Sequence, residues 1–212
     1  MNVIYFIKIL KPKNMKKTFL IIVALIVSSI LNAQTHAKKG DYSFLKNEKN
    51  ISIVFDYSNM KVGKKLSEEK YVDEKVKEHN KKEAGKGDKW KEGWFGARES
   101  RYQPKFMELI NKSLDKTSLK ANESGDAKYT LIVKTVFTEP GFNVGVMKQP
   151  AYVNFEMIFI ETDSKKEIKK YILTNVPGSQ AMGYDFDAGS RIAECYAKAG
   201  KMMGAYIAKA LK

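Results

Sequence analysis

The stretch YTLIVKTVFTEPGFNVGVMKQPAYVNFEMIFIE, residues 129–161, contains the two clearest strand patterns of the chain. In each arm apolar side chains recur at alternate positions, which is typical of a strand with one apolar and one mixed face. These residues are Tyr129, Leu131, Val133 and Phe137 in the first arm and Val153, Phe155, Met157 and Phe159 in the second. TDSKK, residues 162–166, then predicts a short turn into a further strand over residues 167–174. The three strands should therefore form an antiparallel meander.

The connection between the two arms, residues 139–150, contains two prolines and two glycines but is not a phosphate-binding loop. It lacks the GxGxxG and GxxxxGK spacings, and it joins a strand to a strand instead of a strand to a helix. Its length of about twelve residues exceeds that of ordinary hairpin loops. Apolar residues alternate with others from Phe142 to Met147. The segment is therefore predicted to extend the hairpin as a two-stranded ribbon.

In a meander this connection lies at the same end of the sheet as residues 175–187, which precede the last helix. The two segments concentrate apolar side chains and glycines at that end. They are Phe142, Met147, Met182, Tyr184 and Phe186, with Gly141, Gly145, Gly178 and Gly183. Two interpretations are open: a surface that contacts a partner, or a pair of loops that pack on each other.

Other elements precede this meander. ISIVFDYS, residues 51–58, alternates like a strand, and the Lys- and Glu-rich residues 61–92 predict a charged surface helix with Ser67 as its N-cap. The glycine-spaced residues 84–106 are expected to form an aromatic loop, and Pro104 suits the first turn of the helix that follows.

The last predicted helix, residues 188–211, carries a core face and a stripe of small residues. In that stripe Gly200 and Gly204 allow another backbone to approach closely, and we expect that neighbour to be the sheet. Asp187 is predicted to cap the helix N-terminus. The sequence thus predicts an α+β fold: one mixed sheet of about four strands, including the antiparallel meander, with helices packed on one face in a two-layer sandwich.

Both tryptophans of the chain, Trp90 and Trp94, lie in the glycine-spaced segment with Phe95 beside them. Their rings are candidates for a platform that stacks on a sugar or another flat ligand. Buried anchors that hold a loop to the domain have the same pattern, so both interpretations are open. The candidate partner-binding residues are these three aromatic residues together with Phe142, Met147, Met182, Tyr184 and Phe186.

The N-terminus predicts export. MKKTFLIIVALIVSSILNAQ, which begins at Met15, combines two lysines, an apolar core and a small residue at Ala33, the layout of a signal peptide that comprises residues 1–33. The apolar run is too short to span a bilayer, and translation starts at either Met1 or Met15. Residues 34–50 are then a flexible leader, and residues 51–212 a single α+β domain.

We therefore expect a periplasmic or secreted protein that has no membrane span after signal cleavage. Its formal net charge of +14 falls to +9 when residues 1–33 are removed. The lysines are scattered among acidic residues instead of clustered. This pattern favours a protein or glycan of the cell envelope as partner, and no nucleic acid.

Residues for metal or nucleophilic chemistry are scarce. The chain has two histidines, His36 and His79, and one cysteine, Cys195, too few for a zinc centre or a disulfide. Cys195 lies on the apolar side of the last helix and is expected to be buried. We predict no catalytic, cofactor-binding or metal-binding residue.

Acidic residues leave an enzymatic alternative open, because glycoside hydrolysis needs a pair of carboxylates across a groove. The candidates are Glu139, Glu156, Glu161 and Asp185. Their spacing along the chain does not select a pair.

Four phrases, RYQPKFMELINK, YTLIVKT, EPGFNVGV and GYDFDAGSRIAECYAKAG, resemble uncharacterised secreted proteins of Bacteroidetes-type bacteria. The resemblance covers most of residues 90–205 and carries no activity or catalytic residue. The order of a strand, helices, a meander and a final helix is also similar in layout to small envelope-assembly domains such as the curli secretion channel subunit. Such a likeness concerns fold and not function.

The expected function is that of a non-enzymatic envelope module that binds a protein or glycan partner through residues 139–150 and 175–187. One alternative is a hydrolase that acts on polysaccharide with carboxylates near the aromatic loop. Another is a structural homo-oligomer.

Overall fold

The computed structural model describes residues 41–143, 147–178 and 187–212. The predicted signal peptide, residues 34–40 of the predicted leader, and Met182, Tyr184 and Phe186 lie outside these residues. Among the described residues, no helix is long and apolar enough to cross a membrane.

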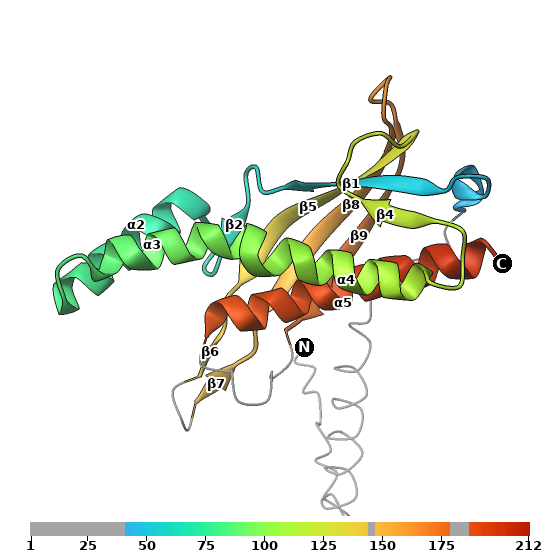
Figure 1. Cartoon of the computed structure of the whole chain (residues 1–212). Helices are drawn as coiled ribbons and strands as arrows, with labels where there is room; N and C mark the ends of the chain where they lie inside the picture. Colours follow the sequence, from blue (N-terminus) through green and yellow to red (C-terminus); the bar gives the residue numbers. More distant parts are fainter. Residues whose placement is uncertain (1–40, 144–146, 179–186) are drawn as a thin grey trace, which may run out of the picture. The chain divides into compact units, whose positions relative to one another are not determined.

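Strand β5 (Tyr129–Glu139) lies at the centre of the sheet and is the first strand of the predicted meander. Along one edge β5 pairs antiparallel with β8 (Tyr152–Glu161), and β8 pairs antiparallel with β9 (Glu167–Pro177). The meander is therefore confirmed. Figure 1 shows these long strands crossing behind the helices.

Four shorter strands complete the sheet on the other edge of β5. β1 (Asn50–Asp56) and β2 (Lys61–Val62) both pair parallel with β5, one after the other along its length. β4 (Lys120–Asn122) pairs parallel with β1, and β3 (Leu66–Ser67) pairs antiparallel with β2. The mixed sheet thus has seven strands, more than the four expected, because strands of two or three residues show no alternation in sequence.

A β-bulge interrupts β5, so the predicted alternation is wrong beyond Thr135. The register shifts between Thr135 and Phe137, so that Thr135 lies opposite Phe155 but Phe137 lies opposite Asn154. Beyond the bulge Thr138 is buried and the Phe137 ring packs on Tyr152 on the other face, with centroids 5.6 Å apart. The extra residue reverses which side chains face the core.

The segment predicted as an aromatic loop is helical. α2 (Glu68–Lys82) is followed by α3 (Lys86–Ala97), the π-helical turn η2 (Arg98–Tyr102) and α4 (Gln103–Leu114), with no break from α3 to α4. Gly85 turns the chain between α2 and α3 with a φ of +78°. Trp90 and Trp94 are one helical turn apart and pack against α2, and this tertiary contact outweighs the low helix propensity of the glycines.

The charged helix is shorter than predicted, since α2 begins at Glu68 and ends at Lys82. Its predicted N-cap is confirmed: the Ser67 side chain accepts a hydrogen bond from the Lys70 amide at 3.4 Å.

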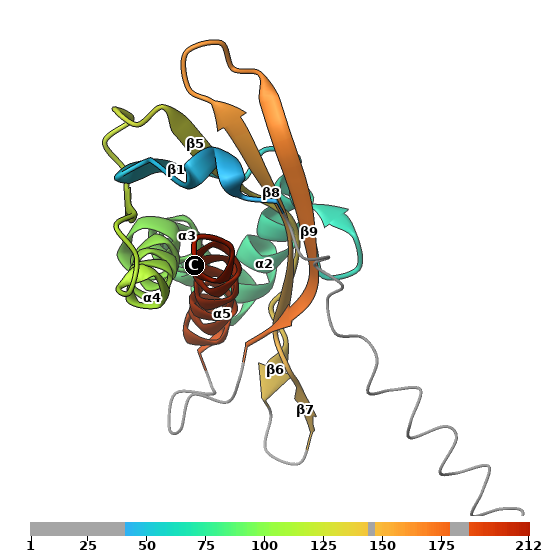
Figure 2. The same ribbon diagram turned by 90° about the vertical axis from the view of Figure 1, so that its right-hand side faces the viewer.

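Two helices, α4 and α5 (Ala188–Ala210), cover one face of the sheet, as Figure 2 shows. The small-residue stripe of α5 packs on α4 and not on the sheet, which corrects the expectation. A Cβ atom at Gly200 would clash with the Phe106 carbonyl, and one at Gly204 would lie 2.6 Å from the Ile110 carbonyl oxygen. The other face of α5 meets the sheet, where the fully buried Tyr196 hydroxyl lies 2.6 Å from the Thr135 hydroxyl.

The folded core begins before residue 51. The 3₁₀-helix η1 (Ser43–Leu45) brings Leu45 into the core, and the buried Tyr42 ring stacks on Tyr171 with centroids 5.2 Å apart. These residues correct the prediction of a flexible leader for its described part, residues 41–50, because an apolar side chain and a ring in that part have partners in the core.

Candidate functional site

The predicted connection between β5 and β8 is a ribbon in which β6 (Phe142–Asn143) pairs antiparallel with β7 (Lys148–Gln149). It projects beyond the end of the main sheet (Figures 1 and 2). Phe142 is 42% exposed and Met147 is 60% exposed, although both are apolar. The interpretation of these two residues as self-packed loop anchors is therefore not supported within the described residues.

A buried arginine fixes the corner at which the ribbon leaves β5. Arg191, only 4% exposed, donates hydrogen bonds from α5 to the Pro140 carbonyl at 3.1 and 3.2 Å and to the Gly141 carbonyl at 3.1 Å. Gly141 has a φ of +63°, and a Cβ atom there would clash with the Gln149 carbonyl. Glycine is required at this position because both its backbone conformation and the close approach exclude a side chain.

The end of β9 meets this corner, as the meander predicts. The Gly178 amide donates to the Ala151 carbonyl at 2.8 Å, and Pro177 lies opposite Tyr152 in the β8–β9 register. A Cβ atom at Gly178 would clash with the Arg191 carbonyl. Within the described residues, the two predicted segments thus converge on Arg191.

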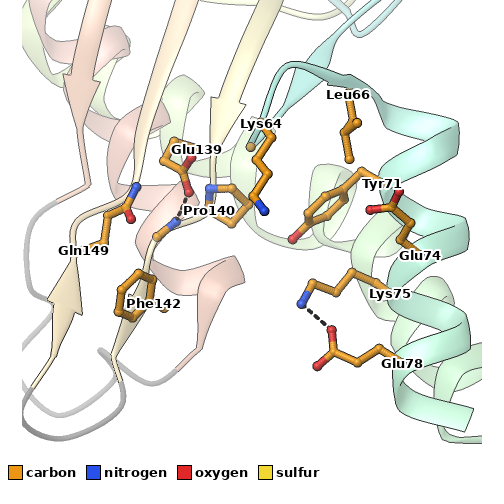
Figure 3. A pocket seen from close by; sticks show the side chains of 12 residues that line it. Lys64, Leu66, Tyr71, Glu74, Lys75, Glu78, Glu139, Pro140, Phe142 and Gln149 are labelled. Atoms are coloured by element: carbon orange, nitrogen blue, oxygen red, sulfur yellow. Dashed lines mark hydrogen bonds and ion pairs between the residues drawn. The ribbon is translucent and has the colours of Figure 1, made fainter. Parts of the chain in front are cut away.

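A groove of about 540 Å³ runs between this corner and α2; we call it the corner groove (Figure 3). Tyr71 and three charged residues of α2 form one wall, and Glu139 to Phe142 with Gln149 form the other. Lys64, from the turn between β2 and β3, also lines the groove. Figure 3 shows the Tyr71 ring reaching from α2 into the space between the walls.

The charges of the corner groove are mixed, with Lys64 and Lys75 among Glu74, Glu78 and Glu139. Hydrogen bonds from Lys75 at 2.7 Å and Lys82 at 3.1 Å lower the pKa of Glu78 to about 2, so this carboxylate stays ionised near neutral pH. Burial, reinforced by the negative charges of Glu139 and Glu78, raises the pKa of Tyr71 to about 12. Its hydroxyl is therefore protonated and can donate a hydrogen bond to a ligand.

The tryptophans do not line the corner groove but pack beneath one of its walls. Trp90 stacks on Trp94 with centroids 5.5 Å apart and on His79 at 5.6 Å, and Tyr71 lies 5.3 Å from Trp94. Trp94 is 9% exposed. Neighbouring rings thus occupy faces of both indoles, which favours the interpretation of the tryptophans as anchors.

The polar end of Trp94 is also occupied. Its indole Nε1 donates to the Glu68 carboxylate at 2.7 Å, and the same carboxylate forms an ion pair with Arg98. The Arg98 guanidinium lies 4.2 Å from the centroid of the Tyr57 ring. Phe95 differs from the tryptophans, since it is 37% exposed on α3.

A smaller groove of about 190 Å³ lies between α3, which carries both tryptophans, and the start of α5. Trp90 and Trp94 line it together with Arg101, Asp187 and Gly189. Asp187 caps α5 as predicted, accepting from the Gly189 amide at 3.0 Å and the Ser190 amide at 3.3 Å, and it pairs with Arg101. The tryptophans and Phe142 therefore line separate grooves, and Tyr71, which lines the corner groove, packs on Trp94.

The three described carboxylates among those proposed for hydrolysis are not brought together. Glu139 lies at the corner groove, whereas Glu156 pairs with Lys170 at 3.4 Å and Glu161 accepts a hydrogen bond from Ser164 at the far end of β8. Asp185 lies outside the described residues.

Cysteine and metal chemistry receive no support from the described part of the chain. Cys195 is fully buried, as expected, and burial raises the pKa of its thiol to about 12. Within the described ranges, no group of three or more histidine, cysteine or acidic residues is placed to hold a metal ion.

The sequence did not identify Tyr71 or the charged residues of α2 as members of a site. Tyr71 contributes to the thin apolar stripe of its helix, and the lysines and glutamates resemble an ordinary solvated surface. Only the packing of α2 beside the β5–β6 corner makes them a wall.

Comparison of the chain with protein-family models, with curated proteins and with solved structures finds no match.

Proposed function

We propose that the protein is a non-enzymatic module of the cell envelope that binds a protein partner through the β6–β7 ribbon and the corner groove. The observation that carries this proposal is the exposure of Phe142 and Met147 on a ribbon that Arg191 anchors. Exposed aromatic and methionine side chains are enriched in protein interfaces, and methionine adapts its shape to a partner.

A protein partner is favoured over a glycan. Sugar binding commonly uses an open aromatic face, and neighbouring rings already stack on both indoles. The corner groove instead offers charges of both signs, a tyrosine donor and the Phe142 ring. Such a mixed surface suits the side chains of a folded protein or peptide.

A crosslinking experiment tests the proposal directly. A photo-reactive amino acid is placed at Met147 and, as a control, at Ile168, which is 38% exposed on β9. After irradiation of cells that produce the full chain, we expect a discrete adduct with another protein at position 147 and not at position 168. No adduct, or the same adducts at both positions, would contradict the proposal.

Two phenylalanine variants provide a matched pair. Phe142→Ser should reduce the adduct about 30-fold, the loss expected when a hot-spot side chain is removed. Phe95→Ser removes a similarly exposed ring from α3 and should leave the adduct unchanged. Melting temperatures of both variants should match the original, because neither ring is in the core. A glycan array that binds the protein in the absence of any protein adduct would favour the glycan alternative.

A further inference from the structure

The sheet face opposite α4 and α5, which we call the open face, carries an ordered pattern across β1, β5, β8 and β9. The strand registers place eight side chains of this face in two neighbouring cross-strand rows. The first row is Val54, Ile132, Ile158 and Lys170, and the second is Asp56, Lys134, Glu156 and Ile172.

Apolar residues on the open face are exposed to an unusual degree for β-branched side chains in strands. Ile172 is 57% exposed and Val54 is 48% exposed. Ile132 and Ile158 are half-buried between them. A contiguous apolar patch with charges around it is typical of an interaction surface.

The edges of the sheet are protected against pairing, in contrast to this face. Edge strand β9 contains a bulge at Asn175, which has a φ of +52° and whose amide donates to the Asn154 side chain at 2.6 Å. Pro177 ends β9, and on the opposite edge the short strands β3 and β4 cover β2 and the first three residues of β1. Bulges, prolines and short edge strands prevent edge-to-edge association, so the face is the part of the sheet left for a partner.

From this pattern we infer that the open face forms a two-fold symmetric dimer with a second copy of the chain. Consider a two-fold axis parallel to the strands, between β5 and β8. It lays β5 over β8 of the other copy and reverses the order of each row. Lys134 of one copy then faces Glu156 of the other, and Ile132 faces Ile158.

The outer positions match along the diagonal and not directly. Lys170 comes to lie over Val54 of the second copy and Ile172 over its Asp56, so that Lys170 lies one row from that Asp56 and Ile172 one row from that Val54. The central positions thus meet as an apolar pair and an opposite-charge pair, and each outer side chain has a matching neighbour one row away. Such self-complementarity is what an isologous interface requires.

The charges are already paired within one chain, which lowers the cost of covering them. Lys134 lies 2.9 Å from Asp56, and Lys170 lies 3.4 Å from Glu156. Asp56, Lys134 and Glu156 are partly buried in the single chain, and Lys170 is exposed. A paired charge costs less to desolvate than an isolated one.

The area of the open face is sufficient for a specific dimer. Four strands about 4.8 Å apart and about ten residues long give a face of roughly 19 by 33 Å, or about 600 Å² for each copy. Two such faces bury about 1,200 Å², the lower end of the range for specific interfaces. We therefore expect a dimer that dissociates on dilution.

The test is the oligomeric state of the purified protein, measured by sedimentation velocity between about 1 and 200 µM, a range that spans weak interfaces. A concentration-dependent dimer is expected, and Ile172→Glu should weaken it at least tenfold, because it places a negative charge over Asp56 of the second copy. Ile172 is more than half exposed, so the fold should survive this change. Phe142→Ser, on the ribbon, should leave the dimer intact and keeps this inference distinct from the proposed function.

Charge exchange tests the predicted symmetry. Glu156→Lys alone opposes two lysines across the axis and should weaken the dimer. Because Lys134 pairs with Asp56 and Glu156 pairs with Lys170 within one chain, only the exchange of all four charges (Asp56→Lys, Lys134→Glu, Glu156→Lys and Lys170→Glu) keeps these pairs, and it should restore much of the dimer. A monomer at every concentration would overturn the inference. The open face would then be covered by N-terminal residues of the same chain or by another protein. Equal dimerisation of Ile172→Glu and the original chain would also overturn it.

Discussion

The two faces of the sheet are built from alternate residues of the same strands, yet their environments differ sharply. On the face under α4 and α5, Leu131, Phe155 and Met157 have no exposed surface. On the open face, Ile132 is half-buried beside Leu131, and Ile172 is 57% exposed. The difference shows that residue type alone does not decide burial here. The helices that cover one face decide it, and they leave equally apolar side chains available on the other.

The sharpest test of this comparison removes neighbouring side chains of similar size from the two faces. Leu131→Ala should lower the free energy of unfolding by about 3 kcal/mol, because it leaves a cavity in a packed core. Ile132→Ala should cost only about 1 kcal/mol, because its side chain is partly solvated in the single chain. Urea denaturation of both variants, at a concentration that keeps the chain monomeric, measures the difference. Equal losses would mean that the open face is as tightly packed as the covered one.

A second test concerns how closely the covering helices approach each other. Gly200→Ala should destabilise the protein by about 2 kcal/mol, since the new Cβ atom would clash with the Phe106 backbone of α4. Gly93→Ala is the matched control, because a Cβ atom at that helical glycine would have no neighbouring atom within 4 Å. It should stabilise the protein by about 0.5–1 kcal/mol through helix propensity. Thermal unfolding followed by circular dichroism reports both effects, and a neutral Gly200→Ala would contradict the close α4–α5 contact.

The covered face could be predicted from the sequence over most of its length. Alternation in residues 129–161 is sufficient to place the meander, and helical spacing in residues 188–211 places α5. The bulge after Thr135 could not be predicted, because an inserted residue leaves no local signal when both of its neighbours suit a strand. The segment that packs against Gly200 could not be predicted either, because a small residue indicates that another backbone approaches closely but not which one.

The candidate site was less accessible to prediction than the fold. The ribbon follows from local alternation and from the topology of a meander, whereas the sequence left open whether Phe142 is exposed or packed against another loop. The wall that contains Tyr71 depends on where the α2–α3 hairpin packs, and three glycines near Trp90 suggested a loop where a helix forms. Residue patterns thus did not predict the contacts between segments that lie far apart in sequence.

A third and smaller effect concerns the start of α5, the helix that covers the inner face. Partial burial alone would raise the pKa of Asp187, but hydrogen bonds from Ser190 and Gly189, with the Arg101 charge, lower it overall. A carboxyl group with a lowered folded-state pKa stabilises the fold above its unfolded pKa of about 3.9. That contribution is lost as the pH falls through the folded-state pKa.

Asp187→Ala should therefore cost about 1 kcal/mol at pH 7, the usual value of an N-cap. The gap between the variant and the original chain should begin to narrow below about pH 4, where Asp187 of the unfolded chain takes up a proton, and should close further until the pH falls below the lowered folded-state pKa. Asp187→Asn keeps a capping oxygen but loses the charge that pairs with Arg101, so it should cost about half as much, and its own stability should lack this pH-dependent contribution. Urea denaturation at several pH values separates the cap from the charge. If the difference in unfolding free energy between the variant and the original chain stays constant down to about pH 3, below the unfolded pKa, the carboxylate acts only as a hydrogen-bond acceptor. The packing of α5 on the sheet would then not depend on the ionisation of Asp187.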